Sequence, residues 1–312
     1  MQPKTKVKFD RDTFNRLKRT IRNMSVTSAR RCEDTAYACK IPEEVGIQLT
    51  NKCNLRCAHC FQWNEEGFFH NMDRKSQCED IDIEIVKKIF DQTASVKSNL
   101  YLWGGEPLCY KWWDELSLLL EQDPRWSILC TNGVLIDKKI DSILKISSSL
   151  AILTSLDGFE AENDAIRGKG TFKKVIENID LILDLKKKGI FKGEISVNCV
   201  ISKAMSGKLY DFLEFFEEKG VNTVYFCFPW YLPQETSEKM DLYFREHFDW
   251  LLKLDENSIP SWHSYKYCLD PQVLDSLIPD LNKISSREWK IRVRYQPALE
   301  TGEIEDFIRG KE

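Results

Sequence analysis

Long apolar runs are missing from this sequence. No stretch approaches the roughly eighteen consecutive apolar residues of a membrane span, so we expect no membrane partner. The N-terminus lacks the charged-then-apolar pattern of a signal peptide. Low-complexity linkers and internal repeats are absent too. With 42% hydrophobic and 30% charged residues, the composition is that of a globular protein, which we expect in the cytoplasm.

Cysteine, by contrast, is plentiful. The chain of 312 residues has 11 cysteines, an odd number. A disulfide framework is not expected in a reducing compartment, so clustered cysteines indicate metal binding or catalysis. Scattered cysteines are more often small buried hydrophobes.

Charge is distributed unevenly along the chain. Residues 1–31 carry ten Lys or Arg and two Asp, a balance of +8, so the rest must carry −4 − 8 = −12. Such a basic arm could contact nucleic acid or an acidic partner. The favoured interpretation is a basic, helical N-terminal extension over 1–42, because Phe14, Leu17 and Ile21 recur at near-helical spacing and could dock on the main domain. Nucleic acid is therefore not the expected partner.

From residue 44 onward, strand and helix patterns alternate. Strands are predicted at 44–50, 98–103, 126–130, 150–155, 194–201 and 222–228, with helices at 82–94, 110–122, 137–146, 171–188 and 207–219 between them. Alternation of this kind predicts an α/β fold with a parallel sheet and right-handed crossovers. We expect a partial (β/α)6 TIM-like barrel over 43–235, with its chemistry at the strand ends.

The remaining segment, 236–312, has a mixed pattern. We expect a helix at about 236–254, an aromatic loop with Trp262, Tyr265 and Tyr267, a helix near 270–283 and a strand-like stretch at 291–295. This short α+β segment is expected to close the barrel.

Three cysteines stand together just after the first predicted strand. Cys53, Cys57 and Cys60 have the spacing C-x3-C-x2-C. Thiolate is the ligand that iron–sulfur clusters require, and three ligands leave one iron of a cubane cluster open to a small molecule. A structural zinc site would normally need a second cysteine pair, and none is evident. The alternatives of a zinc site or three buried cysteines stay open on spacing alone.

With this loop the sequence resembles the radical S-adenosylmethionine (SAM) superfamily, whose signature is C-x3-C-x-aromatic-C after the first strand. His59 stands at the aromatic position. The resemblance implies a [4Fe–4S] cluster on Cys53, Cys57 and Cys60, with SAM as cofactor. It also implies that His59 and Phe61 lie near the adenine of SAM.

The second strand is followed by a further match. Gly104, Gly105, Glu106 and Pro107 resemble the GGEP motif of the family, which binds the amino group of SAM. Glycines let the backbone approach a ligand, and a carboxylate can meet an ammonium group. Residues 131–133 (TNG) end the third strand, as in many relatives, although a plain turn would look the same.

Two later motifs resemble a subgroup that includes sulfatase-maturing and peptide-modifying enzymes. Ser155 and Asp157 belong to an SxDG motif, whose serine lies near the ribose of SAM, and Arg167 to a DxxRG motif, whose arginine pairs with the SAM carboxylate. Asn198, on the fifth strand, is placed among the adenosine contacts by the same resemblance. Otherwise, Ser155 and Asp157 could form a helix cap and Arg167 a surface ion pair.

The chain departs from larger members of this subgroup after residue 235. Those members continue into a SPASM or twitch domain with auxiliary clusters, whereas only Cys268 lies beyond 235 here. Auxiliary clusters are therefore not expected. Residues 291–308 look like the stretch that precedes such a domain, so the chain is either naturally short or cut.

The resemblance implies that a donor such as flavodoxin or ferredoxin reduces the cluster, that SAM is cleaved reductively, and that hydrogen is abstracted from a substrate. The leading hypothesis for the substrate is a peptide or protein side chain. The alternatives are a small molecule such as an aminosugar or nucleoside, and a non-catalytic iron–sulfur partner protein. Glu106 and Arg167 speak against the last, since such a protein needs no SAM pocket. No catalytic acid, base or radical donor can be named.

Overall fold

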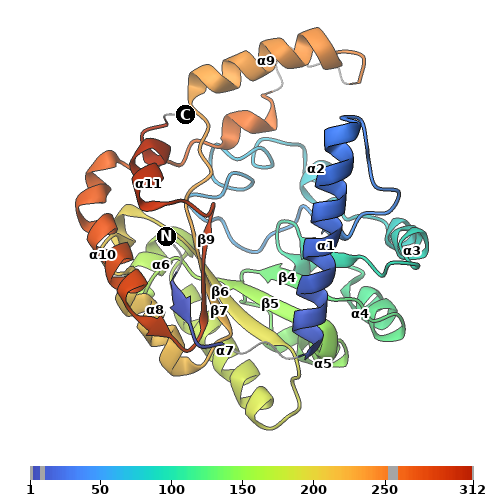
Figure 1. The fold of residues 1–312 in the computed structure, drawn as a ribbon, viewed down its shortest axis with the longest axis horizontal. Helices are drawn as coiled ribbons and strands as arrows, with labels where there is room; N and C mark the ends of the chain where they lie inside the picture. The colour runs from blue at the N-terminus through green and yellow to red at the C-terminus, as the bar shows by residue number, and fades with distance from the viewer. Residues whose placement is uncertain (1–2, 8–10, 252–258, 311–312) are drawn as a thin grey trace.

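The computed structural model describes residues 3–7, 11–251 and 259–310 and contains one large parallel sheet (Figure 1). Its seven strands run in the order β2-β3-β4-β5-β6-β7-β9, and every neighbouring pair is parallel. The strands are β2 (Glu44–Gln48), β3 (Asn99–Trp103), β4 (Ser127–Thr131), β5 (Leu150–Ser155), β6 (Glu194–Val200), β7 (Thr223–Cys227) and β9 (Arg292–Gln296). A small second sheet pairs β1 (Lys4–Thr5) with β8 (Glu288–Trp289).

This architecture confirms the predicted α/β class with parallel strands. All six predicted strands are present, and β9 adds a seventh beside β7. In the described residues β2 and β9 do not pair with each other, so they form the two edges of an open, curved sheet. The strand-like stretch at 291–295 is thus part of the main sheet.

Helices surround the outer face of the sheet because one side of each strand is apolar. Leu102, Leu129, Ile152, Val197 and Val224 are fully buried against them. The covering helices are α3 (Ile83–Gln92), α4 (Trp113–Gln122), α5 (Ile140–Lys145), α7 (Thr171–Lys187), α8 (Leu209–Lys219) and α10 (Leu274–Ser286). The short helix α6 (Glu160–Arg167) packs against α7. Most of the alternate strand residues are half-buried or exposed, and these residues face the inside of the curve.

Helix ends follow the sequence signals. Helix α8 stops at Gly220, which has φ +87° and is the cap that the left-handed conformation favours. Helix α3 begins after Asp82, whose side chain accepts a hydrogen bond from the N–H of Glu84.

The N-terminal extension forms one long helix, α1 (Arg11–Glu33). The expected docking of its apolar residues is wrong, because Phe14, Leu17 and Ile21 are 56%, 42% and 57% exposed. Polar contacts hold the helix instead: Glu43 accepts hydrogen bonds from Arg19 Nε at 2.5 Å and Asn23 Nδ2 at 2.7 Å. Residues 1–2 and 8–10 of this extension lie outside the described residues.

The C-terminal segment contains α9 (Gln234–Phe248) and α11 (Thr301–Ile308) besides α10, β8 and β9. The helix expected at about 236–254 ends at Phe248, and residues 252–254 lie outside the described residues. In the part of the chain that the structure describes, none of the helices has the length and apolarity needed to span a bilayer.

Candidate active site

The cysteine loop follows β2 directly, at the carboxyl end of the sheet. Cys57 is buried, and Cys53 and Cys60 are half-buried. A turn closes the loop, since the N–H of Cys60 donates to the carbonyl of Cys57 at 3.0 Å. The N–H of Ala58 donates to the carbonyl of Ile166 at 2.9 Å, which fixes the loop against the end of α6.

The chemistry of this loop fits an iron–sulfur cluster. Burial raises the pKa of Cys53 to about 12 and that of Cys57 to about 11, so binding iron would have to displace protons. Donors already face two sulfurs: the N–H of Leu55 lies 3.4 Å from Cys53 Sγ, and Arg167 Nη1 lies 3.9 Å from Cys57 Sγ. Such donors stabilise thiolates bound to a cluster.

The potential metal ligands of the described residues are not grouped around a single point. Within residues 3–7, 11–251 and 259–310, no group of three His, Cys, Asp or Glu side chains is placed around a single metal ion. The cysteines of a cubane cluster each bind a different iron, so they need not converge on one point.

The segment after Cys60 also contains a hydrogen-bond donor without a partner. The side-chain Nε2 of Gln62 is buried and has no hydrogen-bond partner among the described atoms.

Gly104 and Gly105 bring the end of β3 against the cysteine loop. The N–H of Gly105 donates to the carbonyl of Thr50 at 2.8 Å, and the N–H of Glu106 to that of Lys52 at 2.7 Å. A Cβ atom on Gly105 would lie 2.3 Å from the carbonyl oxygen of Lys52. The close approach that these glycines allow is therefore to the chain's own loop. Contact with SAM stays a prediction for both.

Glu106 is fully buried, and the next residue, Pro107, is buried as well. The Glu106 carboxylate accepts hydrogen bonds from Thr131 Oγ1 and the N–H of Asn132, both at 2.7 Å. Asn132 Nδ2 in turn donates to Asn54 Oδ1 at 2.7 Å, within the cysteine loop. Residues 131–133 therefore do more than turn the chain: they join β4 to Glu106 and the loop. Burial raises the pKa of Glu106. Its contact with the SAM amino group stays a prediction.

Asp157 is the charged centre of the site. Its Oδ2 lies 2.6 Å from Arg167 Nε and 2.7 Å from His59 Nε2, and the carboxylate is fully buried. Burial alone would raise the pKa of Asp157, but the charge of Arg167 and the contact with His59 hold it well below its usual range. The Arg167 side chain is only 8% exposed, so it is no surface ion pair. Asp157 thus holds the side chains of His59 and Arg167 in place. The contacts expected of these two residues, with the adenine and the carboxylate of SAM, stay predictions.

Ser155 and Asn198 face each other across β5 and β6, where they are partners in the ladder. The thiol of Cys227 on β7 donates to Asn198 Oδ1 at 2.8 Å. Cys227 and Cys130 stand outside the cysteine loop, and as scattered cysteines they are predicted to be core or surface thiols. The structure shows them half-buried on the inner side of the strands. Strand alternation carried this signal, but the pattern alone does not say which side faces inward.

Aromatic side chains from distant segments cover the cysteine loop. Phe61 stacks on Tyr265 with ring centroids 4.6 Å apart, and it lies 5.7 Å from Trp230. His59 lies 5.5 Å from Tyr267. Tyr265 and Tyr267 come from the expected aromatic loop, but no motif placed them beside His59 and Phe61. Only the fold brings these rings together.

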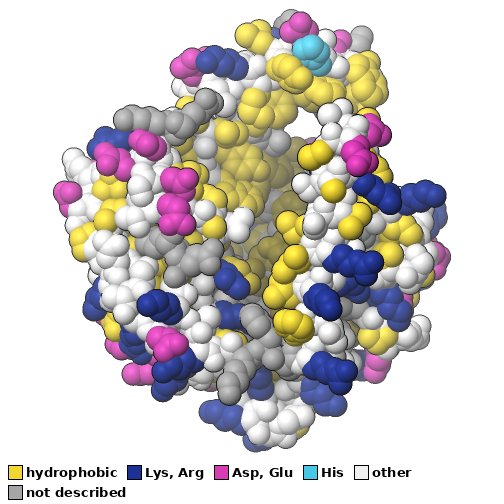
Figure 2. All heavy atoms as spheres, in the orientation of Figure 1, with side chains coloured by type: hydrophobic (Ala, Val, Ile, Leu, Met, Phe, Trp, Pro, Cys, Tyr) yellow, Lys and Arg dark blue, Asp and Glu magenta, His cyan; other side chains and the backbone are white. Residues whose placement is uncertain are grey.

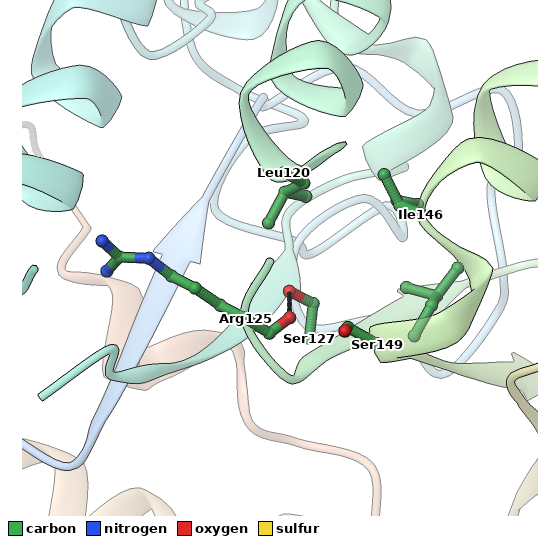
Figure 3. A pocket seen from close by; sticks show the side chains of 6 residues that line it. Leu120, Arg125, Ser127, Ile146 and Ser149 are labelled. Atoms are coloured by element: carbon green, nitrogen blue, oxygen red, sulfur yellow. Dashed lines mark hydrogen bonds between the residues drawn. The ribbon is translucent and has the colours of Figure 1, made fainter. Parts of the chain in front are cut away.

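A small pocket elsewhere in the structure lies away from this site (Figure 3). Its lining includes Ser127 and Leu150, the first residues of β4 and β5, so it sits at the amino ends of the strands. The guanidinium of Arg125, which also lines it, is directed to Thr93 Oγ1 at 2.5 Å and the carbonyl of Phe90 at 2.8 Å. The guanidinium of Arg125 therefore already has hydrogen-bond partners within the protein.

Comparison with known proteins agrees with this geometry. Residues 47–227 match the family described as the Radical SAM superfamily, which is more than half of the chain. The chain therefore belongs to the radical SAM superfamily, whose members are enzymes that use a [4Fe–4S] cluster and SAM. The recognition made from the motifs is confirmed, as are the two cofactors.

Relatives show how far the likeness extends. The chain is 32% identical to Fe-coproporphyrin III synthase of Methanosarcina barkeri over 42% of its own length and 31% of the relative. It is 28% identical to mycofactocin maturase MftC of Mycobacterium ulcerans over 63% of its length and 50% of the relative. The chain thus spans about a third to a half of these proteins. The structure of Streptococcus suis SuiB bound to precursor peptide SuiA matches with a TM-score of 0.58 at 18% identity, covering 89% of this chain and 53% of SuiB.

Proposed function

We propose that the chain binds a [4Fe–4S] cluster through Cys53, Cys57 and Cys60, cleaves SAM reductively, and abstracts hydrogen from a side chain of a peptide or protein. The observation that carries this proposal is the network around Asp157, which joins His59 of the cysteine loop to Arg167, itself beside Cys57. Since cluster cysteines must stay reduced, we place the protein in the cytoplasm, with flavodoxin or ferredoxin as electron donor.

When bound, the cluster and SAM supply the one-electron chemistry. The residues of this chain position the cofactors. Arg167 offers a cation between Cys57 and Asp157, which suits a carboxylate of SAM. Ser155 and Asn198 stand side by side on the inner face of the sheet, where hydroxyl and amide groups suit a ribose. The rings of Phe61, Tyr265 and Tyr267 shield this end of the sheet from water.

Two observations support a peptide substrate over a small molecule. SuiB, whose structure carries a precursor peptide, has the same fold over 89% of this chain, and the relative MftC is named a maturase. In addition, a wide hollow opens along the side of the sheet between α1 and β9 (Figure 2). Such an opening admits an extended chain, whereas small-molecule sites are usually enclosed.

The test of the chemistry is anaerobic reconstitution with iron and sulfide, followed by addition of SAM and dithionite. We expect bound iron and formation of 5′-deoxyadenosine, measured by mass spectrometry. The Cys53→Ala, Cys57→Ala, Cys60→Ala triple variant should lose both. Its matched control is the Cys32→Ala, Cys39→Ala, Cys268→Ala triple variant, which changes three exposed cysteines and should behave as wild type. Equal iron binding by the two triple variants would refute the ligand assignment.

The test of the substrate class is co-expression with each short open reading frame beside the gene. We expect one encoded peptide to gain a mass change that depends on Cys53, Cys57 and Cys60. A SAM-dependent change in a sugar or nucleoside, with every peptide unmodified, would favour the small-molecule alternative.

A further inference from the structure

A line of four exposed apolar side chains runs along α1. Phe14, Leu17, Ile21 and Met24 are 56%, 42%, 57% and 67% exposed. Their spacing of three and four residues places them on one face of the helix. We call these four residues the α1 stripe. A contiguous apolar line of this kind is typical of an interaction site rather than of an ordinary surface.

The helix is held by its other side. Asn23 and Arg19, which both donate to Glu43, project away from the α1 stripe on a helix of about 3.6 residues per turn. Glu43 directly precedes β2, so this tether fixes α1 at one edge of the open sheet. The α1 stripe is therefore held in place but left uncovered by the described residues.

The α1 stripe borders the hollow. Figure 2 shows hydrophobic side chains gathered along the side of α1 that faces it, and Figure 1 shows β9 across from α1. On β9, Arg294 and Gln296 are exposed. A flat bilayer cannot easily reach side chains that line a concave surface, whereas a peptide chain can. The shape thus favours a peptide over a membrane.

The positive charge beside the α1 stripe indicates an acidic binding partner. Lys18 and Arg22 are exposed on α1 beside the stripe, and in the part of the chain that the structure describes neither has an acidic partner. Residues 1–31 carry a balance of +8, against −12 for the rest of the chain. An acidic ligand is therefore drawn to this edge and repelled elsewhere.

We propose that the α1 stripe docks an acidic, amphipathic segment of the peptide substrate. Apolar side chains of that segment cover the α1 stripe, and its carboxylates meet Lys18 and Arg22. The inference rests on the proposed peptide-modifying function. Docking here leaves the rest of the peptide free to run along the hollow to the carboxyl ends of the strands, where the cysteine loop lies.

The test is fluorescence anisotropy with a labelled amphipathic peptide that has Leu at its core heptad positions and Glu elsewhere. A peptide with Lys in place of Glu is the charge control. We expect the Glu peptide to bind the full chain, and Leu17→Glu and Ile21→Glu to weaken it about tenfold or more, since each removes a buried apolar contact. The matched control is Leu118→Glu on α4, where the leucine is 44% exposed, and it should bind as wild type.

Reversing the charge of the two basic residues beside the α1 stripe provides a second test. Lys18→Glu with Arg22→Glu should weaken the Glu peptide and not the Lys peptide, whereas Lys188→Glu, at the exposed end of α7, should leave both unchanged. Circular dichroism checks that each variant is folded.

Three results would overturn the proposal: equal binding of the Glu peptide to wild type and Leu17→Glu, equal binding of the Glu and Lys peptides, or a dimer in sedimentation analysis that Leu17→Glu dissolves. The last would show that a second copy covers the stripe. Because the assay needs neither iron nor SAM, the triple cysteine variant should bind the Glu peptide as wild type does. Failure here is thereby separated from failure of the proposed chemistry.

Discussion

The buried ion pair between Asp157 and Arg167 makes the stability of the protein sensitive to the loss of Arg167. Arg167→Leu would leave the fully buried carboxylate with His59 as its one remaining ion-pair partner among the described residues. Removing one partner of a buried ion pair typically costs about 3–5 kcal/mol of unfolding free energy. We expect a loss of this size in urea denaturation of the chain without iron.

A second variant separates charge from packing. Adding Asp157→Asn to Arg167→Leu removes the lone charge, so much of the lost stability should return. Arg309→Leu, which breaks the exposed pair with Glu305, should change stability little. If the double variant is as unstable as Arg167→Leu, the loss comes from packing of the arginine stem instead.

Gly105 offers a prediction about the geometry of the cysteine loop. In Gly105→Ala, the new Cβ would lie 2.3 Å from the carbonyl oxygen of Lys52 and 2.5 Å from that of Asn51. Backbone atoms must move, so we expect about 1–3 kcal/mol of destabilisation and less iron bound per chain after reconstitution. Gly302→Ala is the control, because its Cβ meets nothing within 4 Å. Normal iron content in Gly105→Ala would show that the loop position does not govern binding.

At the scale of elements, Asp280 on α10 caps α8. Its carboxylate accepts hydrogen bonds from the N–H groups of Leu209 at 2.6 Å and Tyr210 at 3.2 Å, the first two residues of α8. Asp280→Ala should therefore cost about 1–2 kcal/mol, measured by thermal or urea unfolding. Asp275→Ala, at an exposed position in the first turn of α10, should lower the unfolding free energy by only about a few tenths of a kcal/mol.

The same residue gives a pH dependence. Burial raises the pKa of Asp280, so folding disfavours its ionised form. Wild type should then lose stability relative to Asp280→Asn as the pH rises from about 4, the unfolded value, through the raised folded value. Urea titrations of both proteins over this range measure the difference. A difference that grows in favour of wild type with rising pH would mean that the helix cap, not burial, controls this carboxyl.

The whole molecule shows which features its sequence could predict. Strand positions followed from short apolar runs, and the end of α8 from Gly220, because these signals are local. The contact of His59 with Asp157 spans 98 residues, and only the SAM-site motifs hinted at it. Nothing placed Tyr265 on Phe61 or β9 beside β7, since such pairings depend on tertiary packing. The apolar pattern of α1 was visible, but a pattern does not say whether a face is covered.

Cooperativity of the whole sheet is the remaining prediction. Because β9 pairs with β7 through five residues of register and Val293 is 5% exposed, β9 should unfold with the sheet even though it follows α9 in the chain. Helix α9, with Leu242 67% and Tyr243 59% exposed, should open at lower free energy, as should α1 with its polar tether. Hydrogen exchange with mass spectrometry, at rising denaturant, should therefore give the seven strands of the large sheet one common opening free energy, and α1 and α9 smaller ones. Exchange of β9 together with α9 would instead show that the segment after residue 235 unfolds as a separate unit, independently of the sheet.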